Sequence, residues 1–216
     1  MKKLCISIVS FLFILTGLVA QDTNTALRRY FNGRDLDNRG RTSDAVAEYN
    51  AAILMCLQVL ESQPQNMDAY AVYTWSLYRL RKYADTVSVC RQALNIKEDP
   101  RIIETMGEAL FYINNFDECL VQMQRYINMS PDGDRVAVAY FFEAEVYRNR
   151  NQYNKAEFLY TVATHFEPSI ALWWFRLGFV REMIGNNVAT AIEAYTRAVA
   201  LNPNYTEAVN ALNRLQ

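Results

Sequence analysis

The sequence contains little glycine, little proline and a single histidine, and each scarcity excludes a class of structure or chemistry. Only 7 Gly and 5 Pro occur among 216 residues, which is too few for the turns of a β-rich fold of this length. Ala, Leu and Arg are frequent instead, and they favour helices connected by short loops. Because 51% of the residues are hydrophobic, the chain can bury a core, and we expect an ordered all-α protein.

The single histidine, His165, excludes a Ser-His-Asp triad and a histidine-rich metal site made by this chain alone. It stands in the segment THFEP, at the predicted end of a helix, where a partial positive charge complements the helix dipole. No glycine-rich phosphate-binding loop occurs. Glu104 and Glu108 share a helix face, but with Arg101 beside them they indicate a surface ion network or a receptor for a basic side chain rather than catalytic carboxylates. We therefore expect no enzymatic activity and no cofactor.

The charge balance is close to neutral, since 22 Lys and Arg face 23 Asp and Glu, for a formal charge of −1. The charge becomes −3 once Lys2 and Lys3 are set aside. The chain therefore lacks the basic surface that a phosphate backbone attracts, and we expect no nucleic-acid partner.

The N-terminus reads MKKLCISIVSFLFILTGLVAQ, with two lysines, an apolar stretch from Leu4 to Ala20, and then a polar residue. This order is typical of a secretory signal peptide, and the small residue Ala20 before Gln21 predicts the cleavage site. A retained anchor is the alternative, although about 17 apolar residues are few for a membrane span. Cys5 stands at the start of the apolar stretch, which argues against a lipoprotein. We expect an exported protein of the periplasm or the extracellular space, in a bacterial cell envelope, with no stable membrane span after cleavage.

Three cysteines remain after the predicted cleavage, Cys56, Cys90 and Cys119, and an odd number cannot all pair with one another. Each lies within an apolar helical pattern, and none has a CxxC partner. We expect them to be buried as small hydrophobic residues. A single disulfide between two of them is the alternative.

An internal repeat decides the fold. Four residues recur in one register near the C-terminus, each displaced by 35 positions: Ala156, Tyr160, Ala163 and Pro168 return as Ala191, Tyr195, Ala198 and Pro203. Upstream, Tyr140 corresponds to Trp174 with a displacement of 34, so one residue is inserted between these two groups. The repeating unit is therefore a pair of helices.

These residues resemble the tetratricopeptide repeat, whose signature is an aromatic residue, Leu-Gly and Tyr on the first helix, and Ala, an aromatic residue and Pro on the second. The last unit of this chain shows the signature as Trp174, Leu177, Gly178, Ala191, Tyr195, Ala198 and Pro203. Earlier units diverge progressively, and the first has Arg29 where the aromatic residue belongs. In physical terms, small residues let paired helices approach closely, aromatic rings fill the remaining space, and proline ends the second helix.

The resemblance implies an all-α, right-handed α-solenoid of about five stacked helix-turn-helix units with a C-terminal capping helix. We expect a signal peptide over residues 1–20 and one repeat domain over residues 21–216. Within that domain we expect repeats at approximately 26–64, 67–99, 100–133, 137–170 and 171–205, and a capping helix at 206–216.

The second helix of the first repeat is longer than its counterparts. Ala52 and Pro64 are 12 residues apart, where the last two units have 5 between the equivalent positions, and the extra 7 residues are two helical turns. We therefore expect the helix from Asp44 to Ser62 to project beyond the stack. Its apolar residues from Ile53 to Leu60 then need a cover, which either the first helix or a second copy of the chain would supply.

In the family that this chain resembles, the first helix of each unit lines a concave groove through the positions one, five and eight residues after the signature aromatic residue. Transferring that spacing gives three positions in each of the five units, which include Asp37, Ala71, Glu145 and Glu182. The candidate binding set chosen from them, the predicted groove residues, is the following: Tyr30, Arg34, Trp75, Tyr78, Glu104, Glu108, Phe111, Phe141, Arg148, Phe175 and Phe179. Some of these rings, notably Phe141 and Phe175, would instead pack between neighbouring helices. As a set they indicate an aromatic-lined groove for an extended or helical peptide.

Some members of the family hold a C-terminal carboxylate with lysine and asparagine at paired groove positions. Here those positions contain Tyr30 and Arg34, Ala71 and Trp75, or Glu104 and Glu108, so that clamp is absent. The sequence therefore predicts a scaffold that binds another protein or peptide. Two alternatives remain, a structural homo-oligomer assembled through the helix from Asp44 to Ser62, and a carrier that encloses a small molecule or lipid in its groove.

Overall fold

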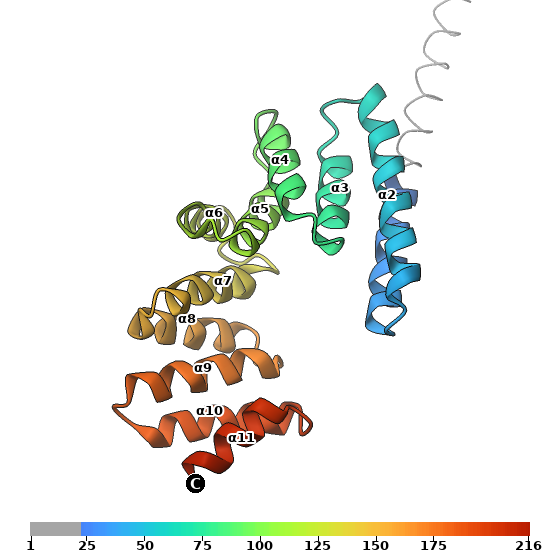
Figure 1. Cartoon of the computed structure of the whole chain (residues 1–216). Coiled ribbons are helices and arrows are strands. Elements are labelled where there is room, and N and C mark those ends of the chain that lie inside the picture. The colour runs from blue at the N-terminus through green and yellow to red at the C-terminus, as the bar shows by residue number, and fades with distance from the viewer. Residues whose placement is uncertain (1–22) are drawn as a thin grey trace, which may run out of the picture. The chain divides into compact units, whose positions relative to one another are not determined.

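The computed structural model describes residues 23–216, so the predicted signal peptide lies outside the described residues. Every regular element of this part of the chain is a helix (Figure 1). A helix over residues 23–38 comes first. The helices that follow are α2 (Thr42–Ser62), α3 (Met67–Arg79), α4 (Tyr83–Leu94), α5 (Pro100–Tyr112), α6 (Phe116–Met129), α7 (Val136–Asn149), α8 (Tyr153–Phe166), α9 (Ala171–Ile184), α10 (Val188–Leu201) and α11 (Thr206–Leu215).

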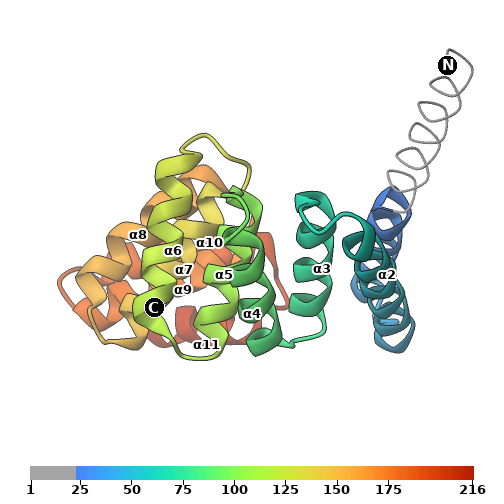
Figure 2. The same ribbon diagram turned by 90° about the horizontal axis from the view of Figure 1, so that it is seen from above.

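These helices form five pairs followed by one C-terminal helix, which confirms the fold class predicted from the repeat. Among residues 23–216, no helix combines the length and the apolar character that crossing a membrane requires. The chain divides into two compact units, Met1–Ala109 and Leu110–Gln216, and the division falls within α5. The first unit packs the helix of residues 23–38 against α2, and α2 against α3 (Figure 2). The second unit packs each helix from α6 to α11 against the next.

Each of the five turns within a helix pair contains one residue with a positive φ angle, at Gly40, Arg81, Asn114, Asn151 and Gly185. A left-handed residue is the common way to end a helix, and glycine and asparagine adopt this conformation with little strain. Arg81 is the exception, with φ of 57° in a residue type that rarely adopts the left-handed region. The same turn geometry therefore recurs although the sequences of the turns differ.

Close contact between paired helices depends on a small residue that faces a tyrosine ring. A Cβ atom on Gly178 would lie 2.7 Å from ring carbons of Tyr195, and one on Gly33 would lie 2.6 Å from a ring carbon of Tyr49. Tyr49 and Tyr195 are both fully buried. The small and aromatic positions of the repeat signature are therefore two sides of one contact.

The three cysteines lie in the core, as the sequence predicts. Cys56, Cys90 and Cys119 are each buried completely, and they are thiols rather than members of a disulfide. Burial raises the pKa of the Cys56 thiol to about 12, so it stays protonated at neutral pH. These residues therefore act as small hydrophobic side chains rather than as reactive thiols.

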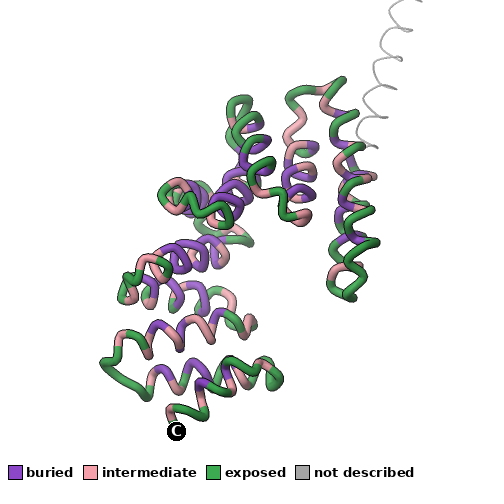
Figure 3. The backbone as a smooth tube through the Cα atoms, viewed as in Figure 1, coloured by how far each residue is buried: buried purple, intermediate pink, exposed green. Residues whose placement is uncertain are grey.

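The length of α2 agrees with the prediction. The other helices of the described chain, however, cover only part of its apolar residues. It has 21 residues, while the helices after it have 10 to 14. Cys56 and Val59 are buried against the first helix and α3, but Leu54 is 64% exposed and Leu57 is 40% exposed. Figure 3 shows exposed residues recurring along the whole of α2. Within residues 23–216, the chain thus leaves an apolar stripe on this helix open to solvent.

Candidate interaction site

The structure brings three predicted groove residues of the first unit together. The rings of Tyr30 and Trp75 lie 5.5 Å apart, and the guanidinium carbon of Arg34 lies 5.9 Å from the centre of the Tyr30 ring. Tyr30 is only 9% exposed, so it supports Trp75 and offers little surface of its own. Tyr78 is half-buried, and its ring lies 5.6 Å from that of Tyr83.

Glu104 and Glu108 do not lie at the surface, which corrects the expectation of a surface ion network or of a receptor for a basic side chain. They are 4% and 6% exposed, because α5 is buried along almost its entire length. Arg101 does not join them. Instead it pairs with Asp99 at 2.6 Å and with Asp68 of α3 at 2.8 Å. The burial of both glutamates leaves them little access to a partner from solution.

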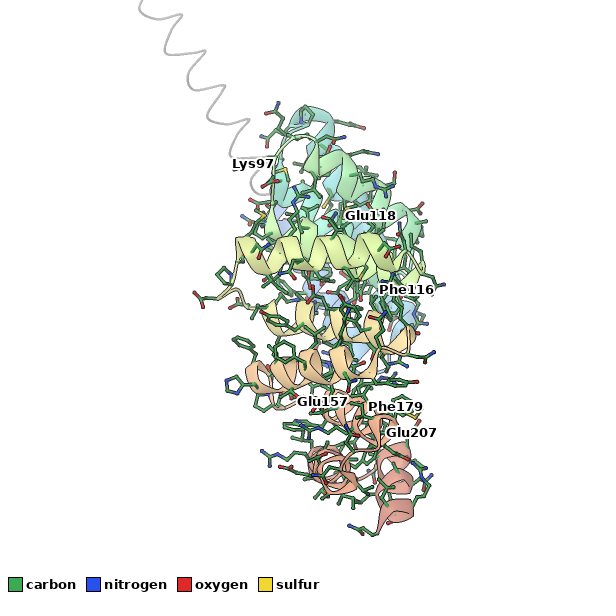
Figure 4. The ribbon with its side chains drawn as sticks, turned by 90° about the vertical axis from the view of Figure 1, so that its left-hand side faces the viewer. Lys97, Phe116, Glu118, Glu157, Phe179 and Glu207 are labelled. Carbon is green, nitrogen blue, oxygen red and sulfur yellow. The ribbon has the colours of Figure 1, made fainter. Side chains whose placement is uncertain are left out.

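The aromatic groove residues of the second unit differ in how much surface they offer. Phe141 is 8% exposed, because its ring stacks on that of Trp173 at 5.0 Å and belongs to the core. Phe111 is half-buried and packs against Phe142 at 5.3 Å and against Phe116, which Figure 4 labels.

Phe175 and Phe179, both on α9, are half-buried. The ring of Phe175 lies 5.0 Å from that of Tyr205, in the segment that leads into α11. The ring of Phe179, labelled in Figure 4, has an edge contact with Tyr153 at 6.3 Å. Phe179 is therefore the more loosely packed of the two rings.

Arg148, the charged groove residue of α7, belongs to a cluster around Glu145. Its Nε and Nη2 atoms donate to the two oxygens of Glu145 at 3.1 and 2.9 Å. From α8, the hydroxyl of Tyr160 donates to the same carboxylate. Burial and the adjacent Glu145 charge raise the pKa of Tyr160, so its hydroxyl keeps the proton that it donates. The carboxylate of Glu145 is only 7% exposed and is held from two helices.

A second arginine, Arg176 of α9, reaches the same carboxylate. Its Nε atom lies 3.2 Å from Oε1 of Glu145, but the N–H is not aligned for a hydrogen bond, so the contact is electrostatic. Its guanidinium carbon lies 5.9 Å from the centre of the Phe175 ring. No acceptor among residues 23–216 binds its two terminal Nη atoms, and 30% of the side chain is exposed. Two cations thus share one anion.

The transferred groove spacing misses Arg176 and Tyr205. Arg176 stands one residue after the groove position of Phe175, and Tyr205 lies in the connection before α11 rather than on a first helix. The sequence signal that could have found Arg176 is its separation from Glu145 by nearly one repeat length, which places successive first helices side by side.

Among residues 23–216, no group of three or more His, Cys, Asp and Glu side chains could hold a metal ion. His165 is exposed in the last turn of α8, where its ring meets that of Phe166 at 5.9 Å. In the second unit, the Glu145 cluster and the half-buried rings of α9 combine fixed geometry with access to solvent.

No protein-family model and no curated protein matches the chain. Solved structures of tetratricopeptide-repeat proteins do resemble it. Residues 41 to the end of MamA from Desulfovibrio magneticus RS-1 are 17% identical, with a TM-score of 0.63 over 84% of this chain and 97% of that chain. YrrB, described as a TPR protein with an unusual peptide-binding site, is 18% identical, with a TM-score of 0.60 over 92% and 97%. PilF of Pseudomonas aeruginosa is 13% identical, with a TM-score of 0.70 over 90% and 84%. This similarity shows that the chain has the tetratricopeptide-repeat fold.

Proposed function

We propose that the protein is an exported, non-enzymatic scaffold that binds a protein or peptide partner through the first helices of its repeats. The observation that carries this proposal is a set of half-buried aromatic rings on those helices, among them Trp75, Tyr78, Phe111, Phe175 and Phe179. Neighbouring rings fix their orientation, while part of each ring stays accessible. Binding to such rings costs little side-chain entropy, and aromatic residues dominate the energetics of many interfaces.

The fold supports the same proposal, because a solenoid presents many first-helix side chains in a regular array. YrrB has this fold together with an unusual peptide-binding site, so in that protein the fold accommodates a peptide. Export is supported by the sequence of residues 1–20 alone. N-terminal sequencing of the exported protein should find Gln21 as its first residue, and material that begins with Met1 would refute the cleavage.

Site-specific crosslinking in the native host tests the binding proposal. A photoreactive amino acid would replace Phe179 or, in a second variant, Trp75, and crosslinked partners would be identified by mass spectrometry. Phe158 on the second helix α8 is the matched control, because it is 66% exposed and aromatic but lies off the first helices. We expect one partner to be captured at Phe179 or Trp75 and not at Phe158. Equal capture at all three positions, or capture at Phe158 alone, would contradict binding through the first helices.

A structural homo-oligomer is a second candidate, which the open stripe on α2 favours. Leu54 and Leu57 are 64% and 40% exposed on a helix that is longer than every other helix of residues 23–216. Apolar side chains at i and i+3 on one helix face are the usual basis of helix-to-helix association. In this case a second copy of α2 would cover them.

A further inference from the structure

We propose that the outer face of α2 binds the same face of a second copy of the chain, with the two helices antiparallel and a twofold axis at Asn50. This inference rests on the second candidate of the proposed function, the homo-oligomer, and it does not depend on binding through the first helices. The outer face is the side of α2 that includes the open apolar stripe, and it consists of the following residues: Ser43, Val46, Ala47, Asn50, Ile53, Leu54, Leu57 and Glu61.

Two apolar faces lie on opposite sides of α2. The inner face is buried against the first helix and α3, and it consists of the following residues: Ala45, Tyr49, Ala52, Cys56 and Val59. Because a helix turns by about 100° per residue, the outer face lies nearly opposite. Its apolar residues are open to water, since Val46 is 39% exposed, Leu54 is 64% exposed and Leu57 is 40% exposed. A surface helix normally has one apolar face, so the second one indicates a second packing partner.

The outer face also lacks the charged residues that other second helices turn to solvent. No residue from Tyr49 to Leu60 is charged. By contrast, α4 exposes Asp85 and Arg91, and α10 exposes Glu193 and Arg197. The core of a protein interface is depleted of charged residues, whereas a solvated helix face is not. The composition of the outer face is therefore that of an interface.

The outer face complements itself in side-chain size about Asn50. In an antiparallel pair with its twofold axis at this residue, positions equally far from Asn50 along the helix lie at the same level. Each large residue of one copy would then face a smaller residue of the second copy: Leu57 would face Ser43, Leu54 would face Val46, and Ile53 would face Ala47. Large residues pack against small ones without voids. In a parallel pair each residue would face itself, so that large residues would crowd one another.

The charges at the two ends of α2 favour the antiparallel direction as well. Arg39 and Arg41 precede the helix, and Glu61 stands in its last turn, with all three exposed. An antiparallel pair brings Glu61 of each copy to the arginines of the other, whereas a parallel pair places the two Glu61 carboxylates side by side. Both arginines already pair with an aspartate of their own chain. These exposed charges therefore select the direction and contribute little to affinity.

Asn50 is the polar residue at the centre of the outer face, and it fixes the register. One of its amide hydrogens donates to the backbone oxygen of Val46 at 2.9 Å. An amide has a second hydrogen and an oxygen, so two Asn50 side chains on a twofold axis can each donate to the other. Any other register would place this amide against apolar side chains. A single asparagine in a helix interface is known to specify register in this way.

Engineered cysteines test the arrangement in the purified protein at high micromolar concentration. Asn50→Cys places a thiol at the twofold axis, so mild oxidation should convert most of the protein into a covalent dimer. Leu57→Cys alone should stay monomeric under denaturing conditions, because its two thiols would be separated by the rise of about 14 residues, roughly 21 Å. A disulfide needs Cα atoms within about 7 Å of each other. A mixture of Ser43→Cys and Leu57→Cys should form a covalent heterodimer.

Two controls show whether a crosslink reports a specific contact. The wild-type protein should form no covalent dimer, because its cysteines among residues 23–216 are buried thiols. Ser88→Cys places a thiol at an exposed position of α4, the next second helix, and should give only the low yield of random collision. All the substituted positions are exposed, so the variants should fold as the wild type does.

Each other outcome would overturn the inference in a different way. A covalent dimer of Leu57→Cys alone, with none in the mixture, would show a parallel pair and leave the homo-oligomer standing. Yields that nowhere exceed that of Ser88→Cys would exclude pairing through α2. An oligomer found by light scattering would then use another surface, and a monomer would leave the outer face to a different protein. Binding through the first helices is tested separately, by capture at Phe179.

Discussion

Single residues determine how closely the helices of each pair approach. At Gly178 any side chain would meet the ring of Tyr195, because a Cβ there would lie 2.7 Å from ring carbons. We expect Gly178→Leu to lower the free energy of unfolding by about 1 to 3 kcal/mol, the usual range for overpacking. Thermal or urea unfolding followed by circular dichroism measures this change. Ala200→Leu, at an exposed position of α10, is the control and should be nearly neutral.

Glu143 is a buried carboxyl group whose protonation links stability to pH. The side chain is 6% exposed, and burial raises the pKa of the carboxyl group to about 7, from 4.5. Because the folded state holds this proton more tightly than the unfolded chain, stability falls as pH rises from about 4.5 to 7 and stays lower above that range. We expect Glu143→Gln to stabilise the protein by roughly 1 to 3 kcal/mol at pH 8 and to have little effect at pH 4. Urea unfolding of both proteins at the two pH values would show this, and an equal effect at both would contradict it.

At the residue scale, the sequence predicts which positions are small, aromatic or charged, but not which side chains remain accessible. The contact between Gly178 and Tyr195 was predictable, because both positions belong to one local pattern. The sequence left open whether Phe141 lines the groove or packs between helices, because the outcome depends on Trp173 in the next repeat. Arg176 was missed for a similar reason, since its role arises from a carboxylate on a different first helix.

At the scale of elements, ion pairs between successive repeats follow the repeat length. Acidic residues and the arginines that bind them are separated by 33, 33 and 32 residues, in the pairs Asp68 with Arg101, Asp117 with Arg150, and Glu182 with Arg214. A separation near one repeat places the two side chains on adjacent units of the stack. Such spacing can be detected in the sequence, although exposed pairs of this kind contribute only about 0 to 1 kcal/mol each.

The open stripe of α2 gives the element-scale prediction. If a second copy of the chain covers Leu54 and Leu57, Leu57→Glu should place a charge in that interface and shift the protein from dimer to monomer. Light scattering across a concentration series measures the mass of both proteins. Glu61→Lys, at an exposed position of the same helix, tests whether a change of charge alone has this effect. A wild-type protein that is monomeric at high micromolar concentration, with stability unchanged by Leu57→Glu, would exclude the homo-oligomer.

The length of α2 could be read from the spacing of Ala52 and Pro64, because both mark fixed points of a repeat. The same spacing could not predict whether other helices bury the apolar residues of α2. Burial depends on which neighbour is present, and a count of apolar residues does not identify that neighbour. The helix pairs themselves were predictable because their signature is local and recurs along the chain.

At the scale of the whole molecule, the fold distributes its accessible side chains among many first helices, so binding should depend on a few anchoring rings. Phe179 is half-buried, and its ring meets that of Tyr153 at an edge, whereas Trp75 supports Tyr30 and the core of the first unit. Truncating Trp75 should therefore cost stability as well as affinity. Phe179 is the better test of binding.

We expect Phe179→Ala to weaken binding of the crosslinked partner by about 2 kcal/mol, because interface energy concentrates in such rings. Arg34→Ala should weaken it by less than about 1 kcal/mol, because this exposed guanidinium stacks on Tyr30 and Phe31 in solvent. Added salt should reduce the effect of Arg34→Ala further and leave that of Phe179→Ala nearly unchanged, since salt screens charges and not apolar contacts. Fluorescence anisotropy with the purified partner at two salt concentrations measures all of these values. Affinity that is indifferent to Phe179→Ala but lost in Phe158→Ala would place the partner on the second helices.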